Sequence, residues 1–149
     1  MEKYIFLDFD GVLNINGQQS FYRAQHFAEV VSPLDHVKIV FSTSWREYST
    51  VEKLASYLPK KIQHKCVGMT PFIREHLTHI RYKEIMLYVN QHGIEQENWV
   101  ALDDLAVLFP KNCDNLILVN PKTGFSRREE KILLDRLLPK QGKSLCKPL

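Results

Sequence analysis

Short, unbroken apolar runs are the feature of this sequence that most restricts its fold. The runs YIFL, IVF and LILV do not alternate with polar residues, so both faces of the corresponding strands must be covered. Parallel strands with helices on both sides show this pattern. Five strands are predicted, at Lys3–Asp8, Val37–Ser42, His64–Gly68, Trp99–Leu102 and Leu116–Val119.

Stretches with helical spacing separate these strands. Helices are predicted at Ser20–Val31, Arg46–Leu58, Lys83–Gln91 and Arg127–Leu138. Ser44 is placed to cap the second helix, Gly93 to end the third and Pro139 to stop the last. We therefore expect a three-layer, Rossmann-like α/β domain with a five-stranded parallel sheet.

The length and composition are typical of one folded domain. Of the 149 residues, 44% are hydrophobic and 25% are charged, which excludes disordered, collagen-like and coiled-coil chains. We predict a single domain over residues 1–138 and a basic, mobile tail over 139–149. No apolar run is long enough to cross a membrane and no signal-peptide core is visible, so we expect a cytoplasmic protein without a membrane partner.

The charges and cysteines identify no partner by themselves. The formal net charge is +3, and the tail supplies this whole excess through Lys140, Lys143 and Lys147. The balanced remainder gives no support to nucleic-acid binding. The three cysteines have no CxxC spacing, so neither a disulfide framework nor a thiolate metal site is expected.

Acidic residues follow two of the most apolar runs. YIFL leads directly into Asp8 and Asp10, and WVAL leads directly into Asp103 and Asp104. Both pairs fall at the carboxyl ends of predicted parallel strands, where open α/β sheets bind their ligands. Carboxylates about 4 Å apart repel each other by roughly 4 kcal/mol at an effective dielectric constant near 20, so converging acids need a cation. Asp also caps helices, but two pairs at equivalent strand ends favour a Mg²⁺ site.

Hydroxyl and basic side chains complete the pattern. Ser42, Thr43 and Ser44 follow the run VKIVF, before a predicted helix whose amides can hold a phosphate. Helix capping also explains Ser and Thr at these positions. Lys83 lies near the start of the helix before the fourth strand, from where its ammonium can reach the same edge, although lysines there usually face solvent.

In this order, the motifs resemble those of the haloacid dehalogenase (HAD) superfamily. The matching pieces are DFDGVL after the first strand, Ser or Thr after the second, a Lys about twenty residues before the last acids, and LDD after the fourth strand. The pieces FLDFDGVLN, STSWR, VGMTP, YKEI, WVALDD and GFS are similar to small phosphatase domains of nucleic-acid repair proteins, among them that of phage polynucleotide kinase-phosphatase. Thr43 follows Asp10 by 33 positions and Lys83 follows Thr43 by 40, which leaves no room for a large cap domain.

The resemblance, which covers residues 4 to about 125, implies a role for each acid. Asp8 would attack phosphorus and form an aspartyl-phosphate, and Asp10 would act first as general acid and then as general base. Mg²⁺ would be held by Asp8, the backbone carbonyl of Asp10, and the carboxylate of Asp103 or Asp104.

The same resemblance implies roles for the hydroxyl and basic residues. Thr43 would bind phosphoryl oxygens and Lys83 would offset negative charge. Ser42 could replace Thr43, and Arg81 could replace Lys83. The candidate substrate-binding residues are Ser42, Ser44 and Arg46.

These features predict a Mg²⁺-dependent phosphomonoester hydrolase, and the resembled domains favour a nucleotide or a nucleic-acid end as the phosphorylated substrate. If the four acids converge on one metal, the remaining exterior is basic and suits a polyanionic phosphoester. A phospho-accepting signalling module and a catalytically idle interaction module are the alternatives. Signalling receivers carry their acceptor Asp on a middle strand instead of the first, which disfavours the first alternative. Every polar residue that the phosphatase mechanism needs has a candidate in this sequence, so nothing favours the second.

Overall fold

A single sheet of parallel strands organises the molecule. In the computed structural model, which describes residues 1–139, five parallel strands lie in the order β3-β2-β1-β4-β5. The strands are β1 (Lys3–Leu7), β2 (Val37–Phe41), β3 (Cys66–Met69), β4 (Trp99–Asp103) and β5 (Leu116–Leu118). Each predicted strand is confirmed, with ends shifted by one or two residues. The predicted tail lies outside the described residues from position 140 onward.

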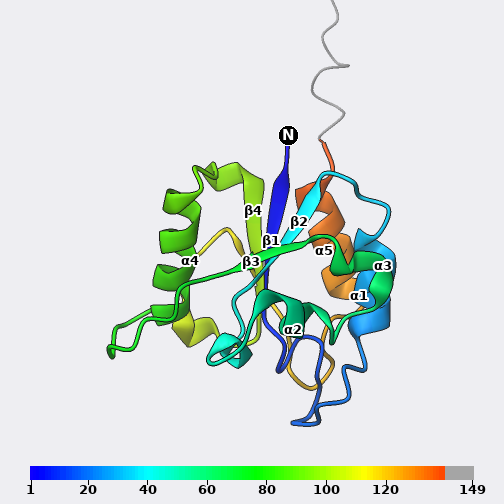
Figure 1. Cartoon of the computed structure of the whole chain (residues 1–149), viewed down its shortest axis with the longest axis horizontal. Coiled ribbons are helices and arrows are strands. Elements are labelled where there is room, and N and C mark those ends of the chain that lie inside the picture. Colours follow the sequence, from blue (N-terminus) through cyan, green and yellow to red (C-terminus); the bar gives the residue numbers. More distant parts are fainter. Residues whose placement is uncertain (140–149) are drawn as a thin grey trace, which may run out of the picture.

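Helices cover both faces of the sheet (Figure 1). They are α1 (Ala24–Val31), α2 (Val51–Ala55), α3 (Lys60–Gln63), α4 (Ile80–Gln91) and α5 (Arg127–Leu137), with the 3₁₀ turns η1 (Ser44–Arg46), η2 (Gln96–Asn98) and η3 (Ala106–Leu108). Because side chains alternate along a strand, Ile5 and Leu7 face one side of the sheet and Phe6 faces the other. Ile5 and Leu7 pack with residues of α1, α2, α3 and α5, whereas Phe6 packs with residues of α4. The predicted three-layer α/β fold is confirmed.

The segment after β2 differs most from the prediction. Instead of one helix over Arg46–Leu58, the chain forms η1, a turn and the short helix α2. Tyr48 interrupts the helix, because its φ of +61° lies in the left-handed region. Thr43 caps η1 and Thr50 caps α2, so the predicted helix cap at Ser44 is wrong.

The other helices agree more closely with the prediction. α1 begins four residues later than expected, after Phe21 takes a φ of +54°, and α4 begins three residues earlier, at Ile80. Gly93 follows the last turn of α4 with a φ of +62°, as expected of a helix-ending glycine. α5 ends at Leu137, just before Pro139.

The connections between strands are short. Within residues 1–139, α1 and its flanking loops join β1 to β2, and a loop with α4 joins β3 to β4, so neither connection contains an inserted domain. In the same part of the chain, the helices fall short of the length and apolarity that a bilayer span requires.

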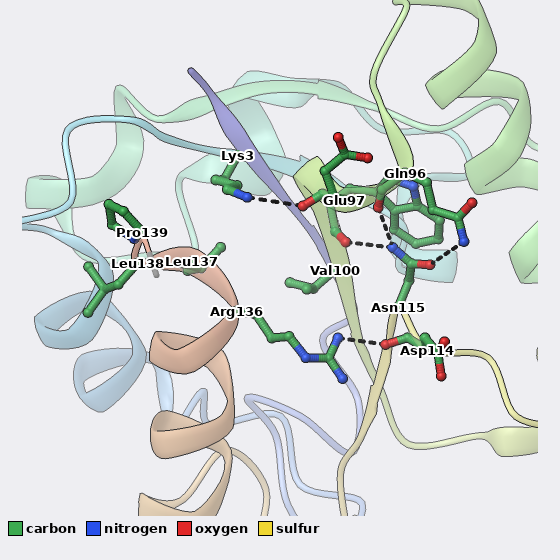
Figure 2. Close-up of a pocket in the computed structure, with 11 residues that line it drawn as sticks. Lys3, Gln96, Glu97, Val100, Asp114, Asn115, Arg136, Leu137, Leu138 and Pro139 are labelled. Carbon is green, nitrogen blue, oxygen red and sulfur yellow. Dashed lines mark hydrogen bonds between the residues drawn. The ribbon is translucent and has the colours of Figure 1, made fainter. Parts of the chain in front are cut away.

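A cavity of about 580 Å³ lies at the amino ends of β1 and β4 (Figure 2). Its two cationic side chains are bound by backbone carbonyls of the protein itself. Lys3 Nζ donates to the carbonyl of Glu97 at 3.0 Å, and Arg136 Nη1 donates to the carbonyl of Asp114 at 2.6 Å. The acidic pairs of the sequence lie at the opposite edge of the sheet.

The strand order places these acidic residues at a crevice. The chain runs outward from β1 through β2 to β3 and then returns to β4 on the other side of β1, so the topological switch point lies between β1 and β4. Beyond the last paired residues, Asp8 N donates to Leu102 O at 3.2 Å, and Ser42 N donates to Leu7 O at 3.0 Å. Asp8, Ser42 and Asp103 therefore form one row across three strands, on the face that α4 covers.

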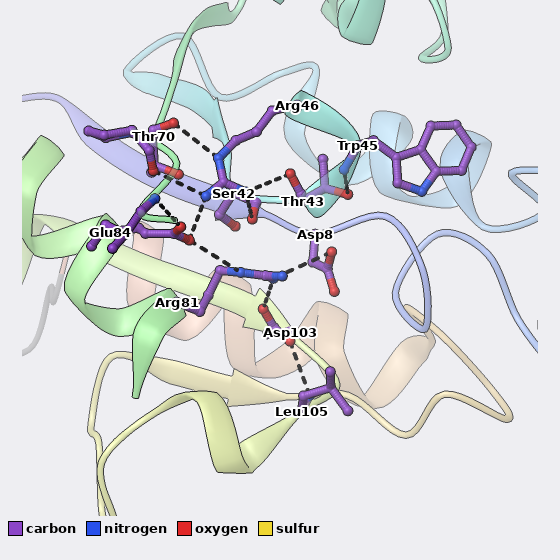
Figure 3. Close-up of polar contacts among 12 residues, drawn as sticks. Asp8, Ser42, Thr43, Trp45, Arg46, Thr70, Arg81, Glu84, Asp103 and Leu105 are labelled. Carbon is purple, nitrogen blue, oxygen red and sulfur yellow. Dashed lines mark hydrogen bonds and ion pairs between the residues drawn. The ribbon is translucent and has the colours of Figure 1, made fainter. Parts of the chain in front are cut away.

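A buried ion pair ties the end of β2 to α4. Arg46 Nη2 lies 2.5 Å from Glu84 Oε1, and both side chains are almost fully buried (Figure 3). The other N–H groups of Arg46 donate to the carbonyls of Ser42, Thr43, Thr70 and Pro71. Burial lowers the pKa of Arg46, and the charge of Glu84 opposes this effect. All five donors of the guanidinium are thus used inside the protein.

Replacing Glu84 by Gln should destabilise the protein strongly. The substitution leaves the Arg46 cation buried without an opposite charge, which costs about 3–5 kcal/mol of unfolding free energy. Equilibrium urea unfolding measures the loss. Glu130→Gln is the control, because Glu130 pairs with His26 at a partly exposed site, where the loss should stay below about 1 kcal/mol. Equal losses in the two variants would contradict the importance of the buried charge.

Candidate active site

Three carboxylates converge at the switch point. Oxygen atoms of Asp8, Asp103 and Asp104 all lie within 4.8 Å of one another. Asp8 follows β1 directly, Asp103 is the last residue of β4 and Asp104 comes next, so the parallel strands bring all three to one edge. Asp8 and Asp103 are buried and Asp104 is partly exposed.

Gly11 allows the third carboxylate to approach the loop after β1. A Cβ atom at this position would lie 2.2 Å from Asp104 Oδ2, much closer than any real contact. Its φ of +84° is also one that other residues rarely adopt. The glycine of the DFDGVL motif therefore provides both the turn and the space for Asp104.

One guanidinium faces the three carboxylates. Arg81 Nη1, from the first turn of α4, lies 2.5 Å from Asp103 Oδ2 and 3.5 Å from Asp8 Oδ1 (Figure 3). Asp103 Oδ1 also accepts the Leu105 N–H at 3.0 Å, and Asp8 Oδ1 accepts the Phe9 N–H at 2.9 Å. Both oxygens of Asp103 are therefore already bound by protein donors.

The carboxylates are poorly compensated. Burial raises the pKa of Asp8 well above its usual range, and the charges of Asp103 and Asp104 raise it further, against the lowering effect of Arg81. Burial likewise raises the pKa values of Asp103 and Asp104. Burial tends to lower the pKa of Arg81, but the charges of Asp103 and Asp8 outweigh it, so this pKa is raised. Three acids share one cation, and a metal ion could be held among them.

The second acid of the DFDGVL motif lies apart from this group. Asp10 is exposed, and its Oδ1 accepts the Asn14 side-chain N–H at 3.1 Å. Its Oδ2 accepts the indole N–H of Trp45 at 2.8 Å. Trp45 is itself fixed by edge-to-face contacts with Phe9 and Tyr57. The Asp10 carboxylate is thus oriented by two donors from different loops.

The predicted hydroxyl residues are found at the end of β2. Thr43 is fully buried, and its Oγ1 accepts the Trp45 N–H at 3.2 Å. Ser42 Oγ is buried and has no hydrogen-bond partner within residues 1–139, and the same holds for Thr70 Oγ1 beyond β3. Ser44 is exposed at the start of η1. This turn of three residues stands where a helix was expected whose amides would bind phosphate.

Two predicted residues have different surroundings from those expected. Lys83 is exposed, and its Nζ lies 3.5 Å from Thr78 Oγ1. Because residues two positions apart point to opposite sides of a helix, Arg81 faces the carboxylates and Lys83 faces away from them. Arg46 has no N–H left for a substrate, so its expected substrate contact gives way to the buried pair with Glu84.

A cavity of about 340 Å³ adjoins the carboxylates. It is lined by Asp10, Gly11, Asn14, Asn16, Gly17, Asp104, Pro121 and Lys122. Its two walls, the loops over 10–17 and 120–124, are joined by a hydrogen bond from Asn16 N to Pro121 O at 3.2 Å. The cavity therefore opens beside Asp10 and Asp104, between two loops that a hydrogen bond joins.

Three residues near the site escaped prediction. Glu84, Thr70 and Asn14 lie inside the quoted pieces YKEI, VGMTP and FLDFDGVLN, but no role was predicted for them, because an isolated Glu, Thr or Asn carries no chemical signature in sequence. The i,i+3 spacing of Arg81 and Glu84 was the one available signal, because it places both on one helix face.

Comparison with known proteins agrees with this arrangement. The family model described as the HAD domain in Swiss Army Knife RNA repair proteins matches residues 4–129. Searches of curated proteins and of solved structures each found no match. The matched range contains β1 from its second residue onward, the other four strands, the three converging carboxylates and Arg81. The chain therefore belongs to the HAD domain family of Swiss Army Knife RNA repair proteins.

Proposed function

We propose that this protein is a Mg²⁺-dependent phosphatase that removes a terminal phosphate from a nucleic-acid end through an aspartyl-phosphate. The observation that carries the proposal is the group of Asp8, Asp103 and Asp104 facing one guanidinium at the switch point. Membership in a domain family of RNA repair proteins supports the nucleic-acid end as substrate.

The donor set fits a hard cation. Asp8 and Asp104 would hold Mg²⁺ directly, because Asp104 lines the open cavity and Asp8 Oδ2 accepts no N–H donor within residues 1–139. Asp103 would position this pair, since Arg81 and the Leu105 N–H already bind its oxygens. The backbone carbonyl of Asp10 is a further candidate ligand. Bound Mg²⁺ would supply positive charge that stabilises the transferring phosphoryl group.

Asp8 is the proposed nucleophile. A carboxylate oxygen of Asp8 attacks phosphorus, the ester P–O bond breaks, and the leaving oxygen takes a proton from Asp10. In the second step, Asp10 accepts a proton from water, the resulting hydroxide attacks phosphorus, and the bond to Asp8 breaks with release of phosphate. The Trp45 and Asn14 contacts support this role, because they hold the Asp10 carboxylate beside the cavity where a leaving group fits.

Arg81 takes the role first considered for Lys83. Its contacts with Asp8 and Asp103 support a function in orienting the nucleophile and in balancing the charge of the transition state. Ser42 and Thr43 remain the proposed phosphoryl contacts, since Ser42 lies in the same row as Asp8 and its hydroxyl has no hydrogen-bond partner among residues 1–139. Ser44, exposed beside them, is a further candidate.

Wild-type protein should hydrolyse a chromogenic aryl phosphate only when Mg²⁺ is present. Asp8→Asn should lower kcat at least about a thousandfold, because an amide is a poor nucleophile. Release of the chromophore measures this. Equal turnover by the Asn variant would refute Asp8 as nucleophile, and stable phosphate on wild-type Asp8 without turnover would favour a phospho-accepting module instead.

Arg81→Lys should reduce kcat about 10- to 100-fold, because the shorter lysine side chain cannot place its ammonium where Arg81 Nη1 meets both Asp8 and Asp103. Lys83→Met should stay within about twofold of wild type, since Lys83 faces away from the site. Steady-state kinetics of the two variants under identical conditions compare the residues directly. A large loss in the Lys83 variant alone would reverse the assignment.

Mg²⁺ should raise Tm by about 5–10 °C at a hundredfold excess over Kd, as seen by thermal melting. The folded protein raises the pKa values of three carboxyl groups, those of Asp8, Asp103 and Asp104. The metal-free protein is therefore most stable at low pH, where these groups are protonated, and it loses stability as the pH rises through their raised pKa values. The Mg²⁺ shift should therefore be larger at pH 8 than at pH 5.

Asp104→Asn should abolish most of this shift and make the metal-free protein more stable at pH 8, because one of three repelling charges is gone. Asp135→Asn, on the exposed side of α5, is the matched control and should keep the full shift. A shift independent of both pH and Asp104 would place Mg²⁺ binding elsewhere on the protein.

A further inference from the structure

One aromatic side chain in the turn after η1 is almost fully exposed. Tyr48 lies between η1 and α2, is 90% exposed and has a φ of +61°. A bulky residue in the left-handed region is strained, and an exposed ring recovers little by burial. Glycine would adopt the same backbone with less strain. The stability of the fold therefore does not explain why a tyrosine stands here.

Stacked cationic and aromatic groups connect Tyr48 to the candidate active site. Arg74 Cζ lies 5.6 Å from the ring centroid of Tyr48 and 5.3 Å from that of Phe72. On the same Phe72 ring, Arg46 Cζ lies 4.9 Å from the centroid. Arg46 Nη1 in turn donates to the carbonyls at the end of β2, beside the proposed phosphoryl contacts. We refer to Tyr48, Phe72 and Arg74 as the aromatic platform.

The charge on the platform remains accessible. Arg74 Nη1 lies 2.9 Å from Glu47 Oε2, which fixes the guanidinium beside the turn. The Arg74 side chain is nevertheless 61% exposed, so it can meet a second anion. Glu75 and His76 are exposed next to it, and His79 is the remaining ionisable group of the loop between β3 and α4. The platform thus offers a flat aromatic face and a cation together.

We propose that the aromatic platform binds an unpaired nucleic-acid strand whose terminal phosphate occupies the candidate active site, an inference that rests on the proposed function. A base is flat and uncharged and stacks on Tyr48, while a backbone phosphate pairs with Arg74. Base pairing would hide the faces that stack, so the platform selects single strands. A peptide supplies no regular alternation of flat rings and phosphates, which makes it the less suitable partner.

Fluorescence anisotropy tests the platform in the full chain. The protein carries Asp8→Asn to prevent turnover, and the probe is a short, labelled, single-stranded RNA with a 3′-phosphate. Adding Tyr48→Gly should raise Kd about tenfold, the cost of one lost stacking contact, and Tyr48→Trp should restore binding. Because glycine suits a φ of +61°, the Gly variant should melt at or above the Tm of its parent, which separates lost binding from lost folding.

A matched control uses another exposed tyrosine beside an arginine. Tyr22 is 65% exposed, and its ring centroid lies 5.1 Å from Arg23 Cζ. Tyr22→Ala should leave the Kd for the RNA within about twofold of the parent value. Arg74→Gln should lower the slope of log Kd against log salt by about 0.7, as expected for one lost phosphate contact on a single strand.

Turnover separates this inference from the proposed function. In otherwise wild-type protein, Tyr48→Gly should lower the ratio of kcat/KM for the RNA to that for an aryl phosphate about tenfold. An unchanged RNA affinity in the Gly variant, an equal loss in Tyr22→Ala, or equally Tyr48-dependent binding of a phosphopeptide would overturn the platform. Failure of the proposed function would instead appear as no phosphate release by wild type from either substrate, while the anisotropy result is unaffected.

Discussion

A single guanidinium facing three carboxylates determines how the carboxyl edge of the sheet is built. Arg81 comes from α4 and its partners come from β1 and β4, so this contact fastens the helix layer to the switch point. Three residues further along the helix, Glu84 pairs with Arg46 and so fixes the end of β2. The nucleophile candidate and the hydroxyl residues are therefore held by one continuous network of charges. Acids outnumber bases in this network, and the proposed Mg²⁺ would balance the difference.

The sequence predicted those parts of the molecule that depend on simple repetition. Unbroken apolar runs identify strands covered on both faces, and the five predicted strands lie within one or two residues of the observed ones. Because carboxyl ends of parallel strands share an edge, four acids could be expected to converge without knowing how the helices pack, and Asp8, Asp103 and Asp104 do so. The fourth, Asp10, lies apart from them, because its exposed carboxylate is held by Asn14 and Trp45. The order of the motifs along the chain predicted the HAD superfamily, and the family match over residues 4–129 confirms this prediction.

Features that depend on helix starts and on tertiary contacts could not be predicted. Placing the start of α4 at Lys83 instead of Ile80 obscured which side chain faces the sheet, since Arg81 and Lys83 point in nearly opposite directions. Arg46 resembled a substrate ligand because its pairing with Glu84 joins residues far apart in sequence. Helical spacing also continued through Tyr48, where the backbone turns left-handed in a way that no periodic pattern reveals.

The short strand connections have a consequence for the solvent. Within residues 1–139 no inserted domain stands over the cavity beside Asp10, and its two walls are joined by the Asn16–Pro121 hydrogen bond, so the cavity is open to solvent in this structure. Water weakens every charge interaction in such a site. For the proposed reaction, part of the dehydration that other proteins obtain by closing over a ligand would come from the ligand's own bulk. A nucleic-acid end, the proposed substrate, is larger than the cavity of about 340 Å³ and would itself cover the site that binds it.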